Sequence, residues 1–307
     1  MVKLIECVPN FSEGRNAEVV AQIREAVEGT DGTMILGSEM DASHNRSVLT
    51  FAGTPAVVEE AAFAATRRAS ELIDLNRHRG EHPRIGATDV LPLIPLSGVS
   101  MEECVALSVR LAKRISEELG IPTYLYEHSA RSPGRKNLSD IRKGEYEGLR
   151  EAVLTDEERR PDFGGPALHP TAGATVVGAR PLLVAYNIYL ATPDVAVAKR
   201  IAKRIRERDG GLPGVKALGF LVAEKNMAQV SINLTDLSKT GMNEVFEMVT
   251  QEAAGEGVTV AESEAVGLVP AAEFIRIGMQ KLKLKEFDRN QVIESRLLDL
   301  MIEEKGD

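Results

Sequence analysis

The sequence predicts an α+β protein built from two successive ferredoxin-like (β-α-β-β-α-β) subdomains. The order strand, helix, strand, strand, helix, strand occurs in the first part of the chain and recurs in the second. The 307 residues, 43% hydrophobic and 27% charged, suffice for two domains of ordinary globular composition. In each subdomain the helices are expected to cover one face of an antiparallel sheet. We therefore expect subdomains at residues 1–180 and 181–307, with a ligand groove between them.

The elements of the first subdomain follow from hydrophobic periodicity and from residues that break it. Thr54 and Pro55 form a cap-then-proline helix start, and Gly120 suits the C′ position that ends a helix. The two prolines of "DVLPLIPL" favour an edge strand. The predicted strands are 2–8, 33–39, 46–53, 89–96 and 122–128, and the predicted helices are 16–28, 54–74 and 101–119.

A long connection rich in Gly, Pro, Arg and Asp follows at residues 129–173, with one short helical stretch near 138–150. Connections of this length inside compact proteins are usually functional or disordered. The second subdomain repeats the outline of the first, including a Thr-Pro helix start at Thr192. Its predicted strands are 181–190, 215–223, 227–235 and 257–264, its helices are 192–208 and 242–254, and terminal helices follow at 270–302.

Composition excludes several functional classes. A net charge of −9 argues against a nucleic-acid partner. No stretch reaches the roughly 20 apolar residues of a membrane span, and the first residues lack a secretory signal, so we expect a cytoplasmic protein. Cys7 and Cys104 are too few for a disulfide framework and are expected to be reduced. No dinucleotide fingerprint, P-loop or nucleophile elbow appears, which disfavours nucleotide cofactors and acyl-serine chemistry.

Basic residues nevertheless concentrate in two stretches. One surrounds residues 77–84, and the other lies at residues 131–143. A local positive patch on an acidic protein favours a small polyanionic ligand over a long polyanion. The alternative, for the second stretch especially, is a set of solvated surface charges.

The stretch "NRHRGEHPRIGATD" contains His78, Glu81 and His82 in the order H-x-x-E-H, a spacing that on a helix would present two imidazoles to one zinc ion. Gly80 lies inside the motif and Pro83 follows it, so the helix would end where the second ligand is needed. We therefore predict no metal here. A structural histidine and an acid–base histidine remain as interpretations, and the shaped loop around His82 favours the second.

Several longer motifs together resemble one family. They are "ECVPNFSEGR" (6–15), "HNRSVLTF" (44–51), "EHPRIGATDVLPLIP" (81–95), "DFGG…HPTAGATVVGAR" (162–180), "QVSINLTD" (229–236) and "VGLVP" (266–270). In this order they resemble glutamate formiminotransferase, the transferase part of formiminotransferase-cyclodeaminase. The resemblance extends from residue 6 to near the end of the chain and covers the transferase part alone, so we expect no cyclodeaminase activity.

The resemblance implies a homodimer that moves the formimino group from N-formimino-L-glutamate to N5 of tetrahydrofolate, a co-substrate, in histidine catabolism. His82 matches the catalytic histidine of the family and would act as general acid. The acidic residue that the family places nearby corresponds to Glu39 or Asp41. Both ligands carry glutamyl carboxylates, which makes Arg46 and Arg84 candidate anchors. The folate-binding stretch would consist of Phe163, Gly164, Gly165, Pro166, Ala167, Leu168, His169, Pro170, Thr171 and Ala172.

Two other functions remain open at this point. One is the transfer of a formyl group between 5-formyltetrahydrofolate and glutamate. The other is a non-catalytic folate or amino-acid sensor, because pairs of ferredoxin-like units also serve as regulatory modules. If the chain is a transferase, a separate cyclodeaminase is a candidate partner for its product.

Overall fold

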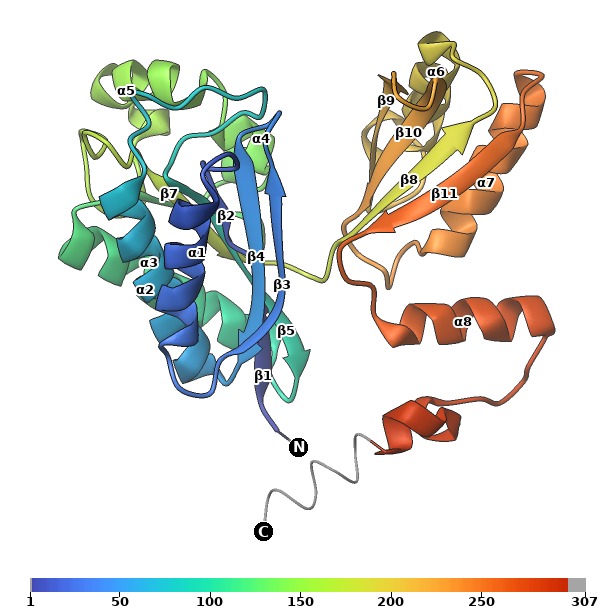
Figure 1. Cartoon of the computed structure of the whole chain (residues 1–307), viewed down its shortest axis with the longest axis horizontal. Coiled ribbons are helices and arrows are strands. Elements are labelled where there is room, and N and C mark those ends of the chain that lie inside the picture. Colours follow the sequence, from blue (N-terminus) through green and yellow to red (C-terminus); the bar gives the residue numbers. More distant parts are fainter. Residues whose placement is uncertain (1, 298–307) are drawn as a thin grey trace. The chain divides into compact units, whose positions relative to one another are not determined.

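The computed structural model describes residues 2–297 and divides the chain into two compact units, one ending at Pro181 and one beginning at Leu182 (Figure 1). Within the described residues, no helix is long and apolar enough to cross a bilayer. Each unit has a hydrophobic core of its own. The architecture is α+β with two separate sheets, as the sequence predicts.

The first unit contains the predicted ferredoxin-like arrangement. Its elements are β1 (Leu4–Cys7), α1 (Ala17–Glu28), β3 (Met34–Asp41), β4 (Arg46–Gly53), α2 (Pro55–Leu72) and β5 (Thr88–Ser97). The strands lie in the order β5–β1–β4–β3, and each neighbouring pair is antiparallel. A two-residue strand, β2 (Asn10–Phe11), pairs with both β4 and β5. The helices pack on the sheet face that carries Ile5 and Phe51, and Val58 of α2 lies in the same core.

Local sequence signals set the helix ends of this unit. The Asn16 side chain accepts hydrogen bonds from the first turn of α1. Thr54 is the N-cap of α2, with Pro55 as its first residue. Helix α3 (Met101–Leu119) begins with a capping box formed by Ser100 and Glu103, and it ends at Gly120 in the left-handed conformation.

Two further strands extend the first sheet beyond the ferredoxin-like core. Strand β7 (Thr175–Ala179), which the sequence analysis did not predict, pairs parallel with both β5 and β6 (Thr123–Leu125). The chain between β6 and β7 forms short helices: η1 (Glu127–Ser129), η2 (Pro133–Arg135), α4 (Leu138–Ile141), α5 (Glu145–Thr155) and η3 (Glu157–Arg159). The predicted helical stretch 138–150 is thus split in two, at Gly144, which adopts a positive φ.

The prediction that prolines place β5 at an edge of the sheet is wrong. β5 pairs with β1 and β2 on one side and with β7 on the other. Pro92 fits because it lies where the pairing passes from β1 to β2, between Leu93 and Val90. Pro95 fits because the β7 ladder reaches only Leu93, so no partner on that side needs its amide.

The second unit is a ferredoxin-like sheet without extra strands. Its elements are β8 (Val184–Leu190), α6 (Val195–Ile205), η4 (Glu207–Asp209), β9 (Val215–Val222), β10 (Met227–Leu234), α7 (Met242–Gly255) and β11 (Val260–Val266). The strands lie in the antiparallel order β11–β8–β10–β9. The predicted Thr-Pro start of α6 is wrong, because Asp194, not Thr192, accepts the capping hydrogen bond from Ala196.

The C-terminal part begins with α8 (Ala271–Leu282), followed by η5 (Arg289–Gln291). Glu273 of α8 is buried and accepts a hydrogen bond from the Met242 amide at 2.7 Å, which caps the start of α7. The last part of the predicted terminal helices, residues 298–302, lies outside the described residues.

Candidate active site

The loop that carries His82 is not helical. Residues 73–87 run between α2 and β5 without helix, and His82 lies in a bend of this loop. Gly80 is essential to its path, because a Cβ atom there would lie 2.2 Å from the carbonyl oxygen of His44. The other histidine of the motif, His78, is buried with both ring nitrogens in use: Nε2 lies 2.8 Å from the Asn45 carbonyl oxygen, and Nδ1 accepts from Arg84. The described residues contain no group of three or more His, Cys, Asp or Glu side chains arranged to hold a metal ion.

The His82 ring is half-buried and faces cationic neighbours. Nη1 of Arg46 donates to its Nε2. The pKa of His82 is lowered from 6.5 to about 3, first by burial and then by the charges of Arg46 and Arg142, while the nearby Asp89 opposes the shift. The imidazole is therefore neutral at pH 7, and its Nε2 carries a lone pair that can accept a proton.

Two arginines, Arg46 and Arg142, lie close to the His82 ring, and the charges of Asp89 and Asp41 act on Arg46 in the opposite sense to Arg142. Arg142 pairs with the buried Asp89 carboxylate, whose other oxygen accepts from the Ile85 amide at 2.8 Å. The Nε atoms of Arg46 and Arg142 are both buried and have no hydrogen-bond partner among the described residues. Burial, followed by the charge of Arg142, lowers the pKa of Arg46 to about 10. These two Nε groups are donors that a ligand carboxylate can accept from once the side chains move.

Arg84 is placed differently from Arg46. Its side chain is 8% exposed, and every guanidinium nitrogen already donates to the protein. Nε donates to His78, Nη1 to Glu145 and Glu147 at 2.8 Å each, and Nη2 to Glu147 at 2.7 Å. A substrate carboxylate could bind Arg84 only by displacing one of these glutamates. Of the two arginines predicted from the sequence, Arg46 is thus the one with a guanidinium nitrogen that has no partner among the described residues.

The stretch Phe163–Ala172 lies partly beside the His82 loop. Its C-terminal end is joined to that loop by backbone hydrogen bonds, from Leu75 to the Thr171 carbonyl and from Ala87 to the Ala172 carbonyl, both 2.9 Å. Gly164, Gly165, Pro166 and Ala167 are exposed.

The two ends of this stretch have distinct surroundings. The Phe163 backbone pairs with Thr123, and the Arg131 guanidinium lies 4.6 Å from the centroid of the Phe163 ring. His169 has a local role, because its Nδ1 accepts from the Ala172 amide at 3.0 Å and thereby closes the turn; burial lowers its pKa.

Of the two acidic candidates, Asp41 is the one connected to His82. Its carboxylate accepts from the His44 backbone at 2.9 Å and lies 2.6 Å from His44 Nδ1, and these bonds lower the pKa of Asp41. The His44 and His82 ring centroids are 6.2 Å apart in an edge arrangement. Glu39 is exposed on β3, where its register partner is Val48.

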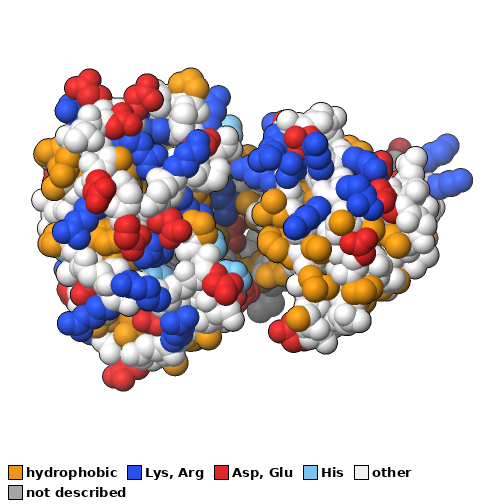
Figure 2. Space-filling model, turned by 90° about the horizontal axis from the view of Figure 1, so that it is seen from above, with side chains coloured by type: hydrophobic (Ala, Val, Ile, Leu, Met, Phe, Trp, Pro, Cys, Tyr) orange, Lys and Arg blue, Asp and Glu red, His pale blue; other side chains and the backbone are white. Residues whose placement is uncertain are grey.

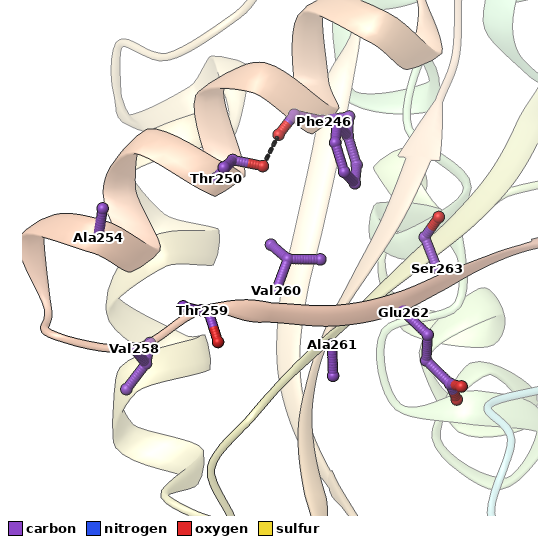
Figure 3. A pocket seen from close by; sticks show the side chains of 9 residues that line it. All are labelled: Phe246, Thr250, Ala254, Val258, Thr259, Val260, Ala261, Glu262 and Ser263. Carbon is purple, nitrogen blue, oxygen red and sulfur yellow. Dashed lines mark hydrogen bonds between the residues drawn. The ribbon is translucent and has the colours of Figure 1, made fainter.

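Two cavities have linings that do not include His82. One, of about 400 Å³, lies between α7 and the start of β11 (Figure 3). Glu262, its one titratable lining residue, points to the other side of the strand and pairs with Lys225, so this cavity offers no acid–base group. A second, also of about 400 Å³, is lined by Arg79, Gly80, Arg84, Gly144, Glu145 and Glu147. It belongs to the Arg84 side of the His82 loop.

Comparison with known families matches both units. A model described as the N-terminal subdomain of the formiminotransferase domain matches residues 4–180, and one described as the formiminotransferase domain matches residues 185–306. The chain belongs to the formiminotransferase family.

Relatives within this family cover nearly the whole chain. A glutamate formimidoyltransferase of Thermoplasma acidophilum is 47% identical over 96% of this chain and 98% of its own length. A glutamate formimidoyltransferase of Streptococcus pyogenes serotype M1 is 44% identical over 97% of this chain and 100% of its own length. The formimidoyltransferase-cyclodeaminase of Gallus gallus is 46% identical over 97% of this chain but only 57% of its own length. The family match thus covers both units, including every candidate residue described above.

Sequence reasoning did not identify all members of the candidate site. It treated Arg142 only as part of a basic stretch, and it assigned no role to His44 or Asp89. The available signal for Asp89 was an acidic residue within an otherwise apolar strand. No local signal marks Arg142, because it reaches the site only through the fold of the connection between β6 and β7.

Proposed function

We propose that this chain transfers the formimino group from N-formimino-L-glutamate to N5 of tetrahydrofolate, releasing 5-formiminotetrahydrofolate and L-glutamate. The observation that carries the proposal is the identity of 44–47% over nearly the full length with proteins named glutamate formimidoyltransferase. The cationic His82 site is suited to an anionic amino-acid substrate. In this proposal tetrahydrofolate is a co-substrate, and no metal takes part.

His82 acts as a proton carrier rather than as an acid that starts out charged. Attack of N5 on the amidine carbon forms a tetrahedral adduct in which N5 carries an extra proton. The neutral imidazole accepts this proton and then donates it to the glutamate nitrogen, whose bond to carbon breaks. The resemblance suggested a general acid, and the pKa of about 3 adds that His82 must first receive the proton it later gives.

Arg46 is the proposed anchor for a substrate carboxylate. In the structure its Nη1 donates a hydrogen bond to Nε2 of His82, and this bond uses the lone pair that proton transfer needs. A carboxylate that engages the free Nε donors of Arg46 and Arg142 would draw the guanidinium from the ring and add negative charge beside it. Both effects raise the pKa of His82, so that it becomes a better base once substrate is bound.

The stretch Phe163–Ala172 is the proposed folate-binding segment. Support comes from its backbone connection to the His82 loop and from the exposed residues 164–167. The Phe163 ring, which already stacks with Arg131, offers an aromatic surface at one end. Holding both reactants in one site contributes to the rate in addition to proton transfer.

The wider setting is also proposed. We infer that the protein works as a cytoplasmic homodimer in histidine catabolism and one-carbon metabolism. Its product would pass to a separate cyclodeaminase. Relatives from animals carry a name that includes both activities, and this chain spans about half of their length.

The decisive experiment is a turnover assay with formiminoglutamate and tetrahydrofolate, following the formimino-folate product. The same assay with 5-formyltetrahydrofolate and glutamate tests the formyl variant of the reaction. We expect turnover with the formimino donor. Binding of folate without turnover of either pair would favour the sensor and overturn the proposal.

A further inference from the structure

We propose that Asn45 is a positioning residue that ties the turn before β4 to the His82 loop and thereby holds Arg46 against the His82 ring. The inference rests on the proposed function of His82. Asn45 lies in the turn between β3 and β4, directly before Arg46. It does not touch the His82 ring in any described contact, so its role is exerted through its neighbours.

Asn45 uses three polar groups to join three segments. Its Oδ1 accepts from the Gly14 amide at 3.0 Å, and its Nδ2 donates to the Arg79 carbonyl at 3.0 Å. Its backbone carbonyl accepts from His78 Nε2 at 2.8 Å. The residue is 7% exposed. A buried amide with all of these bonds made fixes the position of its backbone on both sides.

The backbone of Asn45 also limits which residues can replace it. Its φ is +49°, in the left-handed region that Asn tolerates better than most residues. Two glycines lie in close contact with the same turn. A Cβ atom at Gly14 would lie 2.2 Å from the Asp41 carbonyl oxygen. A Cβ atom at Gly80 would lie 2.9 Å from the Asn45 Cβ. The turn is thus held closely between two loops, and Asn45 supplies the hydrogen bonds across both contacts.

A second chain of contacts anchors Asn45 to helix α5. His78 donates to the Asn45 carbonyl through Nε2 and accepts from Arg84 at Nδ1, 3.1 Å away. This assigns one neutral tautomer to His78, and burial lowers its pKa further. Arg84 is in turn held by Glu145 and Glu147. His78, the histidine of the H-x-x-E-H motif that has no proposed catalytic role, therefore holds the His82 loop in place through its two hydrogen bonds.

The expected consequence concerns the surroundings of the His82 ring. The charged and titratable groups that face it are Arg46 from β4, Asp89 from β5, Arg142 after α4, and His44 from the turn. If Asn45 is lost, Arg46 is freed from its place against the ring. The charge of Arg46 then lowers the pKa of His82 less, and the geometry for proton transfer is lost.

The test compares Asn45→Gly with Asn226→Gly in the full-length protein. Asn226 has φ +50° and occupies the corresponding place before β10, but it is exposed. Glycine keeps the backbone conformation in both turns and removes only the side chain. We expect Asn45→Gly to lower kcat by about 10- to 100-fold and to raise the His82 pKa by about one unit. Asn226→Gly should change neither.

The His82 pKa is read by NMR titration of its ring protons, which requires no turnover. The positioning role can therefore be judged even if the assigned reaction is wrong. A variant that only loses thermal stability, with an unchanged His82 titration and unchanged kcat, overturns the inference. If Asn45→Gly does not fold, the variants His78→Phe and His78→Gln are compared instead. Phe removes the hydrogen bond to the Asn45 carbonyl, so His78→Phe should raise the His82 pKa. Gln can keep this hydrogen bond, so His78→Gln should leave the His82 pKa unchanged. Equal titrations for these two variants would also contradict it.

Discussion

The hairpin turns of the two units have the same local design and different surroundings. In each unit two eight-residue strands are joined by a turn that ends in an Asn with φ near +50°, Asn45 in the first and Asn226 in the second. Asn45 is buried between the Gly14 and His82 loops, although residues 41–44 of its turn are exposed, whereas Asn226 and its turn are exposed. The same turn chemistry therefore serves a site in one unit and only a chain reversal in the other.

The chemistry-bearing residues are distributed as unevenly as the surroundings. All five histidines precede residue 170, so they lie in the first unit. Figure 2 shows Lys and Arg side chains interspersed with Asp and Glu on the surface of this unit, with histidines among them. The first sheet is also the one that gains β6, β7 and their long connection, which supplies Arg142 and the glutamates on Arg84. The extra chain thus adds Arg142 and two glutamates to a site whose other members, such as His82 and Arg46, belong to the ferredoxin-like core.

The largest expected effect is the loss of turnover in His82→Asn. Asparagine keeps a polar side chain but cannot carry the proton, so the rate should fall by about 10²- to 10⁴-fold. Folate binding should persist. The measurement is the formimino-transfer assay together with folate titration. His128→Asn, at an exposed histidine of the same unit, is the control. A His82→Asn enzyme that turns over like wild type would remove the basis for assigning chemistry to this loop.

The next effect is expected for Arg46→Gln. Loss of the charged anchor should raise KM for formiminoglutamate by about 10- to 100-fold. The substitution should also raise the His82 pKa, because the charge of Arg46 is one of the causes that lower this pKa. Arg208→Gln, at an exposed arginine of the second unit, should leave both values unchanged. An unaltered KM would show that the substrate carboxylate binds elsewhere.

A change in the second unit should affect stability alone. Glu273→Ala removes the buried acceptor of the Met242 amide and the partner of Arg276. We expect a loss of about 1–3 kcal/mol in the free energy of unfolding, measured with urea. The NMR titration of His82 should remain that of the wild type. A shifted His82 titration would contradict the separation of roles between the units.

The smallest effect is expected in the acid stability of the first unit. The hydrogen bond with Arg84 lowers the pKa of Glu147 from 4.5 to about 2. A carboxyl group whose pKa is lower in the folded state stabilises that state, and its full contribution is present at pH values above the unfolded pKa. For Glu147 this contribution to the free energy of unfolding is lost as the pH falls from about 4.5 through 2. The Glu147 side chain is 60% exposed, so screening keeps the contribution below about 1 kcal/mol.

Urea unfolding at pH 7 and pH 3 measures this contribution. Glu147→Gln should be slightly less stable than wild type at pH 7, and the difference should shrink at pH 3. A difference that grows toward acid would have the wrong sign for this ion pair.

How much of the fold was predictable depended on the range of the forces involved. The start of α2 at Thr54 and Pro55 and the end of α3 at Gly120 depend on neighbours within a few residues, so the sequence showed them. The place of β5 inside the sheet depends on where β1, β2 and β7 pair with it, and the rule that prolines favour edges therefore failed there. Strand β7 was missed because its partners β5 and β6 are distant in sequence.

The candidate site shows the same division. The order of residues alone determined that His82 stands in a bent, non-helical loop, because Gly80 and Pro83 act on the backbone next to them. It also carried the motifs by which the family is known. Only the tertiary structure decided that Arg46 contacts His82 and keeps an unpartnered Nε while Arg84 is held by glutamates. Burial and charge at an atom depend on every segment that packs around it, and those segments come from four parts of the chain that no local pattern connects.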